Sequence, residues 1–396
     1  MHYDFDKVIN RRNTGAIKWD VPETDLPMWV ADMDFETAPA IKDALKERVE
    51  HGIFGYTTVP EAWYEAYQNW WERRHNFRPA RESMLFCNGV IPAIDTAIRD
   101  LTEPGDQILI LTPTYNHFFI SIKDNSRVPV ECHLTYDNGS YTLNKEDFAA
   151  KAADPKTKIL LLSNPQNPTG TIWDAETLNW IGEICKANNV LVIADEIHCD
   201  LTRRNVVHTP MLKLAAEIAP DYCDRIVSCV APSKTFNLAG LAFSNIIIPG
   251  AEFQKKWFDL VDGQLSLGHG CNPLSLAGAI AAYNEGDEWL DQLKEYLDGN
   301  IEYIGQFVRE HMPKAKTAVC QGTYLLWVDM NGYCSDIQKL EHAMQQIGRV
   351  ALDEGYIFGD EGNGYERINV AMPRALVEDC MMRMKKAADW LEEQND

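Results

Sequence analysis

The stretch Lys158-Ile159-Leu160-Leu161-Leu162-Ser163-Asn164-Pro165-Gln166-Asn167-Pro168-Thr169-Gly170 carries the clearest fold signal in this chain. Its first half is a short, continuous apolar run, which is typical of a strand covered by helices on both faces of a sheet. Its second half contains two prolines that restrict the backbone on both sides of Asn167. We therefore expect a buried strand whose carboxyl end presents an oriented amide. An ordinary turn rich in structure-breaking residues is the alternative.

Similar apolar runs recur along the middle of the chain and alternate with helical patterns such as those over residues 91–101 and 174–188. This alternation is typical of strands joined by helical crossovers, and it predicts an α/β domain with a mostly parallel, seven-stranded sheet. The other six predicted strands are residues 84–87, 107–111, 127–133, 190–194, 225–230 and 243–248.

The pattern changes near residue 285. A long amphipathic helix is predicted over about 288–310, followed by strands at 323–328 and 367–370 and helices near 337–347 and 375–390. We interpret the chain as a large α/β domain over residues 48–285. A smaller α+β domain would comprise residues 1–47, with an N-terminal arm, and residues 286–396.

Composition excludes several classes of function. The 396 residues carry a formal net charge of −22, with no basic cluster, which disfavours nucleic acids and anionic membrane surfaces as partners. No run approaches the 18 or so apolar residues of a membrane span, and the first residues do not resemble a signal peptide, so we expect a cytoplasmic protein. The ten cysteines contain no C-x-x-C pair, so neither a disulfide framework nor a metal site is expected.

Ligands of open α/β sheets bind outside the carboxyl ends of the strands. Read at those positions, the sequence offers a glycine before a helix (Gly89), an oriented amide (Asn167), a carboxylate (Asp195) and an amine (Lys234). A helix start with free N–H groups suits a phosphate, and a desolvated lysine is a nucleophile toward carbonyl groups. Each residue also has a plain alternative: a βα turn, a breaker-rich loop, a helix cap or a solvated surface residue.

Aromatic and histidine side chains lie near the same edge. Tyr115 follows the strand predicted at 107–111, where its ring could stack on a flat ligand. His198 could hydrogen-bond the Asp195 carboxylate and orient it, although a lone histidine is more often structural. Four large aromatic residues recur instead at helical spacing and are expected to pack in the core or an interface: Trp63, Tyr67, Trp70 and Trp71.

The series Asn-Pro-x-Asn-Pro-Thr-Gly, then Asp195-Glu196-Ile197-His198, then Ser233-Lys234-Thr235-Phe236-Asn237 resembles the pyridoxal-5′-phosphate enzymes of fold type I, the aspartate aminotransferase superfamily. The resemblance covers about residues 28–374. It implies that Lys234 is bonded to the cofactor, that Asp195 pairs with the pyridine nitrogen, and that Asn167 hydrogen-bonds the phenolic oxygen.

The same resemblance assigns the remaining site residues. Tyr115 would stack on the cofactor ring, and His198 would belong to the same cofactor site. The phosphate would rest on Gly89, Val90, Ile91 and Ser233. Tyr56 matches a tyrosine that reaches the phosphate of a neighbouring subunit, which implies a homodimer.

For the substrate, Arg374 matches the family's arginine for the α-carboxylate, with Asn167 and Ala31 beside it. Lys234, Tyr115 and Tyr56 are the expected catalytic side chains.

Three departures point to a subgroup. Alanines at 231 and 242 replace a serine and an arginine that bind phosphate in typical aminotransferases, and Ala31-Asp32-Met33-Asp34-Phe35 replaces Gly-Glu-Pro-Asp-Phe. Residues 27–35 and 231–240 are instead similar to the MalY/PatB-type cysteine C–S lyases.

The resemblance therefore implies α,β-elimination on cystathionine or cysteine S-conjugates, which yields a thiol, pyruvate and ammonia. An amino-acid aminotransferase using the same site is the alternative, and a protein–protein regulator built on this scaffold is a third possibility.

Overall fold

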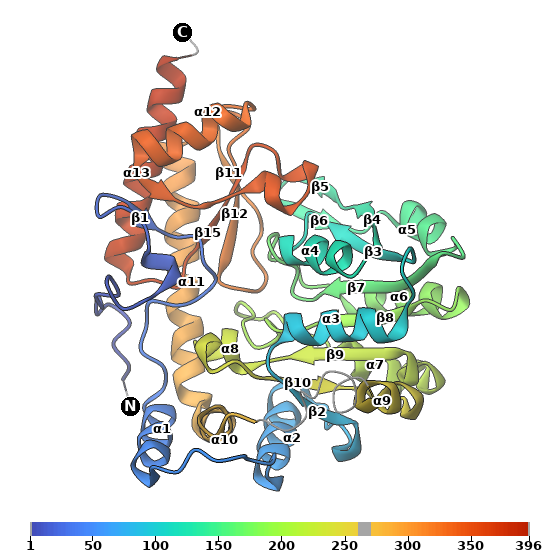
Figure 1. Cartoon of the computed structure of the whole chain (residues 1–396). Coiled ribbons are helices and arrows are strands. Elements are labelled where there is room, and N and C mark those ends of the chain that lie inside the picture. Colours follow the sequence, from blue (N-terminus) through green and yellow to red (C-terminus); the bar gives the residue numbers. More distant parts are fainter. Residues whose placement is uncertain (1, 260–270, 395–396) are drawn as a thin grey trace.

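The computed structural model describes residues 2–259 and 271–394 and contains a central seven-stranded sheet with a second, smaller sheet beside it (Figure 1). The strand order in the large sheet is β2-β10-β9-β8-β7-β3-β4. All seven predicted strands form this sheet: β2 (Met84–Cys87), β3 (Gln107–Thr112), β4 (Val128–His133), β7 (Thr157–Ser163), β8 (Leu191–Asp195), β9 (Ile226–Val230) and β10 (Ser244–Ile247). Strand β10 runs antiparallel to β2 and β9, while the other pairings are parallel, so the predicted mostly parallel sheet is confirmed.

The sheet is buried on both faces because its side chains alternate in direction along each strand. Ile159 and Leu161 of β7 pack in one hydrophobic cluster, whereas Leu160 and Leu162 pack in another. The first cluster includes helices α3 (Val90–Leu101), α4 (Asn116–Asp124) and α9 (Ala251–Phe258). The second includes α2 (Glu61–His75), α5 (Lys145–Ala152), α6 (Ala175–Ala187), α7 (Met211–Ile218) and α10 (Pro273–Glu285).

The aromatic residues of α2 belong to this second cluster. Trp63, Tyr67, Trp70 and Trp71 are all fully buried, which confirms that they are packing residues of the core. They explain why α2, which is polar on average, is held against α10 and the sheet.

The smaller sheet has the order β11-β12-β15-β14, with antiparallel pairing throughout. Its strands are β11 (Lys316–Thr317), β12 (Leu325–Asp329), β14 (Asp353–Glu354) and β15 (Tyr365–Asn369). The long helix α11 (Asp287–His311), the short α12 (Ile337–His342) and α13 (Arg374–Glu393) surround it (Figure 1). The N-terminal part of the chain joins this unit, because β1 (Leu26–Pro27) pairs with β13 (Val350–Ala351).

We propose the same two domains as the sequence predicted, with one adjustment. The boundary at 285/286 falls between α10 and α11. The boundary at 47/48, however, lies inside helix α1 (Pro39–His51), which packs along α10. Since a helix is one cooperative unit, we place this boundary before α1 and assign the whole helix to the large domain.

Among the described residues, no helix combines the length and the apolar character that crossing a membrane requires. The expected cytoplasmic location stays a prediction.

Candidate active site

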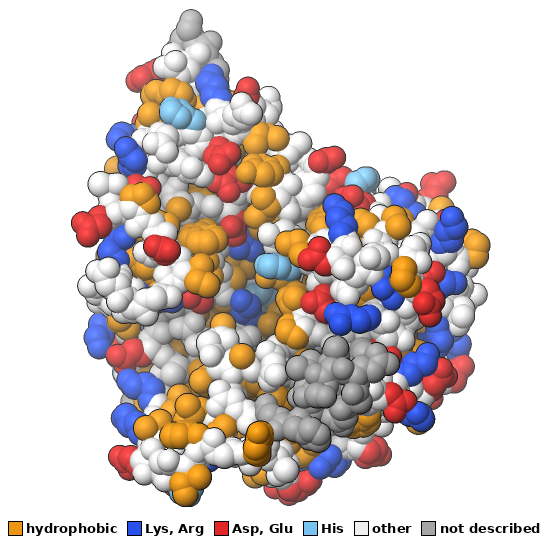
Figure 2. Space-filling model, in the orientation of Figure 1, with side chains coloured by type: hydrophobic (Ala, Val, Ile, Leu, Met, Phe, Trp, Pro, Cys, Tyr) orange, Lys and Arg blue, Asp and Glu red, His pale blue; other side chains and the backbone are white. Residues whose placement is uncertain are grey.

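A cavity of about 260 Å³ lies at the carboxyl ends of the central strands, next to the smaller domain. Figure 2 shows this face hollowed between the two lobes, with basic and histidine side chains visible among apolar ones. The cavity brings together nearly all of the predicted site residues: Ala31, Gly89, Val90, Ile91, Tyr115, Asn167, Asp195, His198, Ser233 and Lys234. Tyr56 and Arg374 do not line it.

Lys234 lies on the one-turn helix α8 (Pro232–Thr235), directly after β9. Its Nζ donates a hydrogen bond to the carbonyl oxygen of Ala31 at 2.7 Å. Burial and, to a smaller extent, the nearby Arg367 charge lower the pKa of Lys234, Asp32 and Asp195 oppose this shift, and the net value is about 8. The amine is therefore a much better nucleophile near neutral pH than an ordinary lysine.

Asp195 is the last residue of β8 and is buried. One of its oxygens accepts a hydrogen bond from the backbone N–H of Ile197 at 3.1 Å. Burial raises the pKa of Asp195 to about 7, against the opposing effects of the Ile197 N–H and the Lys234 charge. A carboxyl group in this position gains most from a ligand that brings a protonated nitrogen against it.

His198 is buried but does not hold Asp195 in place. No hydrogen bond joins the two side chains in the described part of the chain, so the expectation that His198 orients this carboxylate is wrong. The ring packs edge-on against Tyr324 at 5.8 Å, and its Nδ1 has no hydrogen-bond partner among the described residues. Burial, together with the charges of Lys234 and Arg367, holds the pKa of His198 well below its usual value. It is a neutral imidazole at the cavity wall with one free ring nitrogen.

Asn167 follows β7 and is oriented by an arginine of the smaller domain. Arg367 Nη1 donates to Asn167 Oδ1 at 3.0 Å, and Arg367 Nη2 donates to the Trp29 carbonyl at 3.0 Å. Asp353 pairs with the same guanidinium group. Burial raises the pKa of Asp353, and Arg367 opposes this shift. The Asn167 oxygen is thus occupied, which leaves its N–H₂ group as the donor toward the cavity.

Arg374 does not line the cavity, so its predicted role in binding the substrate α-carboxylate is not supported. Its Nε donates to Asn300 Oδ1 at 2.8 Å and its guanidinium lies over the Tyr303 ring, both on α11. The reason is geometric: β15 ends at Asn369, and the chain has left the sheet before α13 begins at Arg374.

The sequence predicts a strand at residues 367–370 but not that Arg367 belongs to the site. The charge of Arg367 within a short buried strand could have indicated a functional residue, because a buried charged side chain needs a partner.

The predicted phosphate cradle is built mostly from backbone. Gly89 precedes α3 with a φ of +147°, and a Cβ at this position would come within 3.3 Å of the Pro92 ring. The first N–H groups of α3 have no acceptor within the helix, and Gly89, Val90 and Ile91 line the cavity together with Ser233. Ala231 and Ala242 also line it, and Lys234 is the only Lys or Arg among its described lining residues.

The two tyrosines predicted for the site, Tyr115 and Tyr56, differ in their location. Tyr115 lines the cavity, and burial raises its pKa to about 12, so its hydroxyl stays protonated at neutral pH. Tyr56 lies between α1 and α2 and is fully exposed, away from the cavity of its own chain.

Comparison with known proteins agrees with this geometry. The family model "Aminotransferase class I and II" matches residues 26–383. The chain is 38% identical to the cystathionine β-lyase PatB of Bacillus subtilis, with 97% of this chain and 99% of PatB covered.

Two solved structures are similar over nearly their whole length. One is a pyridoxal-phosphate-bound putative aminotransferase from Clostridium difficile, with a TM-score of 0.94, 38% identity, and 98% and 100% of the two chains covered. The other is the pyridoxal-phosphate-bound C–S lyase of Staphylococcus hominis, with a TM-score of 0.91, 33% identity and 98% of both chains covered.

The residues around the cavity fit pyridoxal 5′-phosphate. A nucleophilic amine, a buried carboxyl group, a free imidazole nitrogen and an open helix start match its aldehyde, ring nitrogen, phenolic oxygen and phosphate, respectively. Lys234, Asp195, Asn167 with His198, and the α3 start with Ser233 would hold these groups.

The lowered pKa of Lys234 leads to a prediction about cofactor capture. Below pH 8 the amine is mostly protonated, so we expect the capture rate to rise about tenfold per pH unit and to level off above about pH 8. The rate is measured by stopped-flow absorbance after mixing the cofactor-free chain with pyridoxal phosphate, with Lys234→Ala as the control. A rate that keeps rising to about pH 10, as for an exposed lysine, would contradict the buried setting.

Proposed function

Because this chain belongs to the aminotransferase class I and II family, alongside the PatB-type cystathionine β-lyases, we propose that it is a pyridoxal-phosphate-dependent C–S lyase. Its reaction would be α,β-elimination on cystathionine or a cysteine S-conjugate. The observation that carries the proposal is the Lys234 amine, held at the Ala31 carbonyl in the same cavity as Asp195. When bound, the cofactor supplies a sink for the electron pair left at the substrate α-carbon.

Lys234 serves as the base and then as the acid. With a pKa of about 8, its free amine can accept the α-proton, and the resulting ammonium can return a proton to the departing sulfur. Tyr115 is a weaker proton donor, because its pKa is raised to about 12. Asp195 keeps the ring nitrogen of the cofactor protonated, since a buried carboxyl group is stabilised as an anion by a cation beside it.

Arg367 is the group that binds the substrate carboxylate in this proposal. It is buried, adjacent to the cavity through Asn167, and already oriented by Asp353. Arginine can bind a carboxylate through two parallel N–H donors, a geometry that lysine cannot reproduce.

An aminotransferase is the second candidate. One similar solved structure is described as a putative aminotransferase, and the same Lys234, Asp195 and Arg367 would serve that reaction. The two reactions differ in whether a β-leaving group departs from the substrate or the amino group is passed on to a keto acid.

One assay separates the two reactions. The holoenzyme is incubated with cystathionine, and free thiol and pyruvate are followed with and without 2-oxoglutarate. We expect both products without the keto acid, because elimination needs no amino-group acceptor. Product formation that depends strictly on 2-oxoglutarate would establish the aminotransferase instead, and Lys234→Ala should abolish either activity.

A pair of matched variants tests which arginine binds the substrate. Arg367→Lys keeps the charge that balances Asp353 but loses the paired N–H donors, so we expect kcat/KM to fall about 10- to 100-fold. Arg374→Lys should change kcat/KM by less than about twofold. The reverse order, measured as initial rates with cystathionine, would restore Arg374 as the carboxylate-binding residue.

We also propose a homodimer in which Tyr56 completes the site of the partner. Ile53, Phe54 and Tyr56 are largely exposed on one irregular segment, and exposed apolar and aromatic side chains that lie together are typical of a protein–protein interface. Among the residues that the structure describes, the phosphate cradle contains no arginine, so a hydroxyl donor from a second chain would supply a further phosphate ligand there.

Mixing inactive variants tests this arrangement. Lys234→Ala has no reactive amine, and Tyr56→Phe should lose cofactor affinity by about tenfold or more. If Tyr56 acts across the dimer, mixed dimers contain one intact site, so activity should appear on mixing at low pyridoxal phosphate concentration. No recovery in a mixture shown to have exchanged subunits would mean that Tyr56 does not act in the partner's site.

A further inference from the structure

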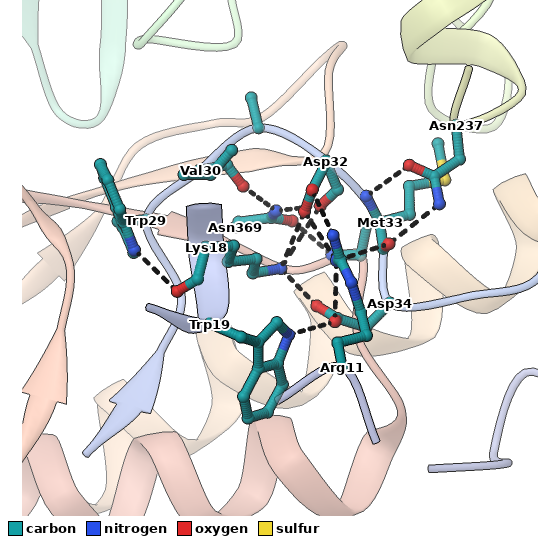
Figure 3. A network of polar contacts seen from close by, with 12 residues as sticks. Arg11, Lys18, Trp19, Trp29, Val30, Asp32, Met33, Asp34, Asn237 and Asn369 are labelled. Carbon is teal, nitrogen blue, oxygen red and sulfur yellow. Dashed lines mark hydrogen bonds and ion pairs between the residues drawn. The ribbon is translucent and has the colours of Figure 1, made fainter. Parts of the chain in front are cut away.

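The carbonyl group that accepts the hydrogen bond from the Lys234 amine belongs to a segment that forms neither helix nor strand. We call residues 29–35 the roof segment, because its Ala31 carbonyl contacts the Lys234 amine. Figure 3 shows its polar contacts with Arg11, Lys18, Trp19, Asn237 and Asn369. The Ala31 carbonyl in this segment accepts from Lys234 Nζ at 2.7 Å and from the Tyr324 hydroxyl at 2.8 Å. The position of the amine therefore depends on what holds the roof segment.

Two asparagines tie the roof segment to the site on either side. Asn237, three residues after Lys234, accepts from the Met33 N–H at 3.0 Å and donates to the Met33 carbonyl at 2.9 Å. Asn369 of β15 donates to the carbonyls of Val30 and Asp32 (Figure 3).

Two cations from the N-terminal segment complete the attachment. Arg11 binds Asp32 through both Nη atoms, at 3.0 and 2.6 Å, and also reaches Asp34 at 3.0 Å. Lys18 pairs with Asp34 and lies 3.8 Å from Asp32. Trp19 donates to Asp34 as well, at 2.6 Å. We call Arg11, Lys18, Asp32 and Asp34 the roof quartet.

The roof quartet is balanced in charge and largely removed from water. The Lys18 and Asp34 side chains are 0% and 1% exposed, and those of Arg11 and Asp32 are 22% and 20% exposed. Buried ion pairs lose hydration that their attraction only partly returns, so they contribute geometric precision more than stability. Apart from a single turn of 3-10 helix at Ile17–Trp19, residues 2–20 form no helix or strand. The ion pairs of Arg11 and Lys18 therefore attach this stretch to the roof segment.

The roof quartet also acts on Lys234 electrostatically. Asp32 raises the pKa of Lys234, together with Asp195, against burial and the Arg367 charge. The neutral His198 faces the same amine. Because Arg11 and Lys18 neutralise Asp32 and Asp34, they limit how strongly the roof segment favours the protonated amine.

We propose that Arg11 and Lys18 are positioning residues for Lys234: by pairing with Asp32 and Asp34 they hold the Ala31 carbonyl where the free ε-amine docks. The proposal rests on the proposed function, since the free ε-amine would act as base and acid only in that reaction. The N-terminal segment is then part of the catalytic apparatus.

Arg11→Met tests the proposal, with Lys7→Met as the matched control. Lys7 lies on the same segment and pairs with the exposed Glu36. In Arg11→Met the unpaired Asp32 charge should move the pH midpoint of cofactor capture upward by about one unit, and Asp32→Asn should move it downward.

The same Arg11→Met variant should lower kcat about 10- to 100-fold with little change in KM, because the amine is misplaced. Lys7→Met should leave all three values as in the native chain.

Hydrogen–deuterium exchange gives a readout that does not depend on turnover. The backbone N–H groups of Met33 and Asp34 are hydrogen-bonded to Asn237 and to the Ala371 carbonyl, respectively, and their exchange should accelerate in Arg11→Met only. If Arg11→Met does not fold, the charge-balanced Arg11→Met/Asp32→Asn variant is measured instead, with the same expectation for exchange and kcat. Exchange and kcat like those of Lys7→Met, in whichever variant folds, would overturn the proposal. Failure of the native chain to capture pyridoxal phosphate would instead overturn the proposed function.

Discussion

The reactivity of this site depends on the balance of charges around the Lys234 amine. Lys234 lies near Arg367, Asp195 and Asp32 and lines the cavity in a half-buried position. Burial and the arginine favour the free amine, while the two carboxylates favour the ammonium ion, and the pKa of about 8 is the outcome of this competition. A lysine with that pKa can exchange a proton in both directions near neutral pH, which a reaction that removes and returns protons requires.

The groups that set this balance come from distant parts of the chain. Asp195 ends a strand of the large sheet, Arg367 belongs to the smaller sheet, and Asp32 follows the N-terminal strand β1. The hydrogen bond from Lys234 to Ala31, and those from Arg367 to Asn167 and Trp29, cross between these units. The placement of the two sheets is therefore part of the electrostatics of the site, and a change in that placement would change the reactivity of the amine.

The site meets its anionic ligands with few cations. Asp353 pairs with Arg367, and the described part of the predicted phosphate cradle offers N–H groups and Ser233 but no arginine. Oriented N–H dipoles can bind an anion without adding a full positive charge next to Lys234, which would depress its pKa further. Ala242, at the position where typical aminotransferases carry an arginine, adds no second cation to Arg367 near the reactive amine.

Local patterns were sufficient to predict much of this arrangement. The apolar runs predicted all seven strands of the large sheet, because strands covered on both faces are continuous in Ile, Leu and Val. Since parallel strands share one carboxyl edge, the order of strands along the chain was enough to place the residues that follow them, including Asn167, Asp195 and Lys234, at one common site.

Local sequence patterns could not indicate which arginine lies next to the cavity through Asn167, what holds the Ala31 carbonyl or why His198 has a nitrogen without a partner. These depend on how β15 and the N-terminal segment pack against the large domain, and no short-range pattern encodes contacts between residues more than three hundred positions apart, such as Trp29 and Arg367.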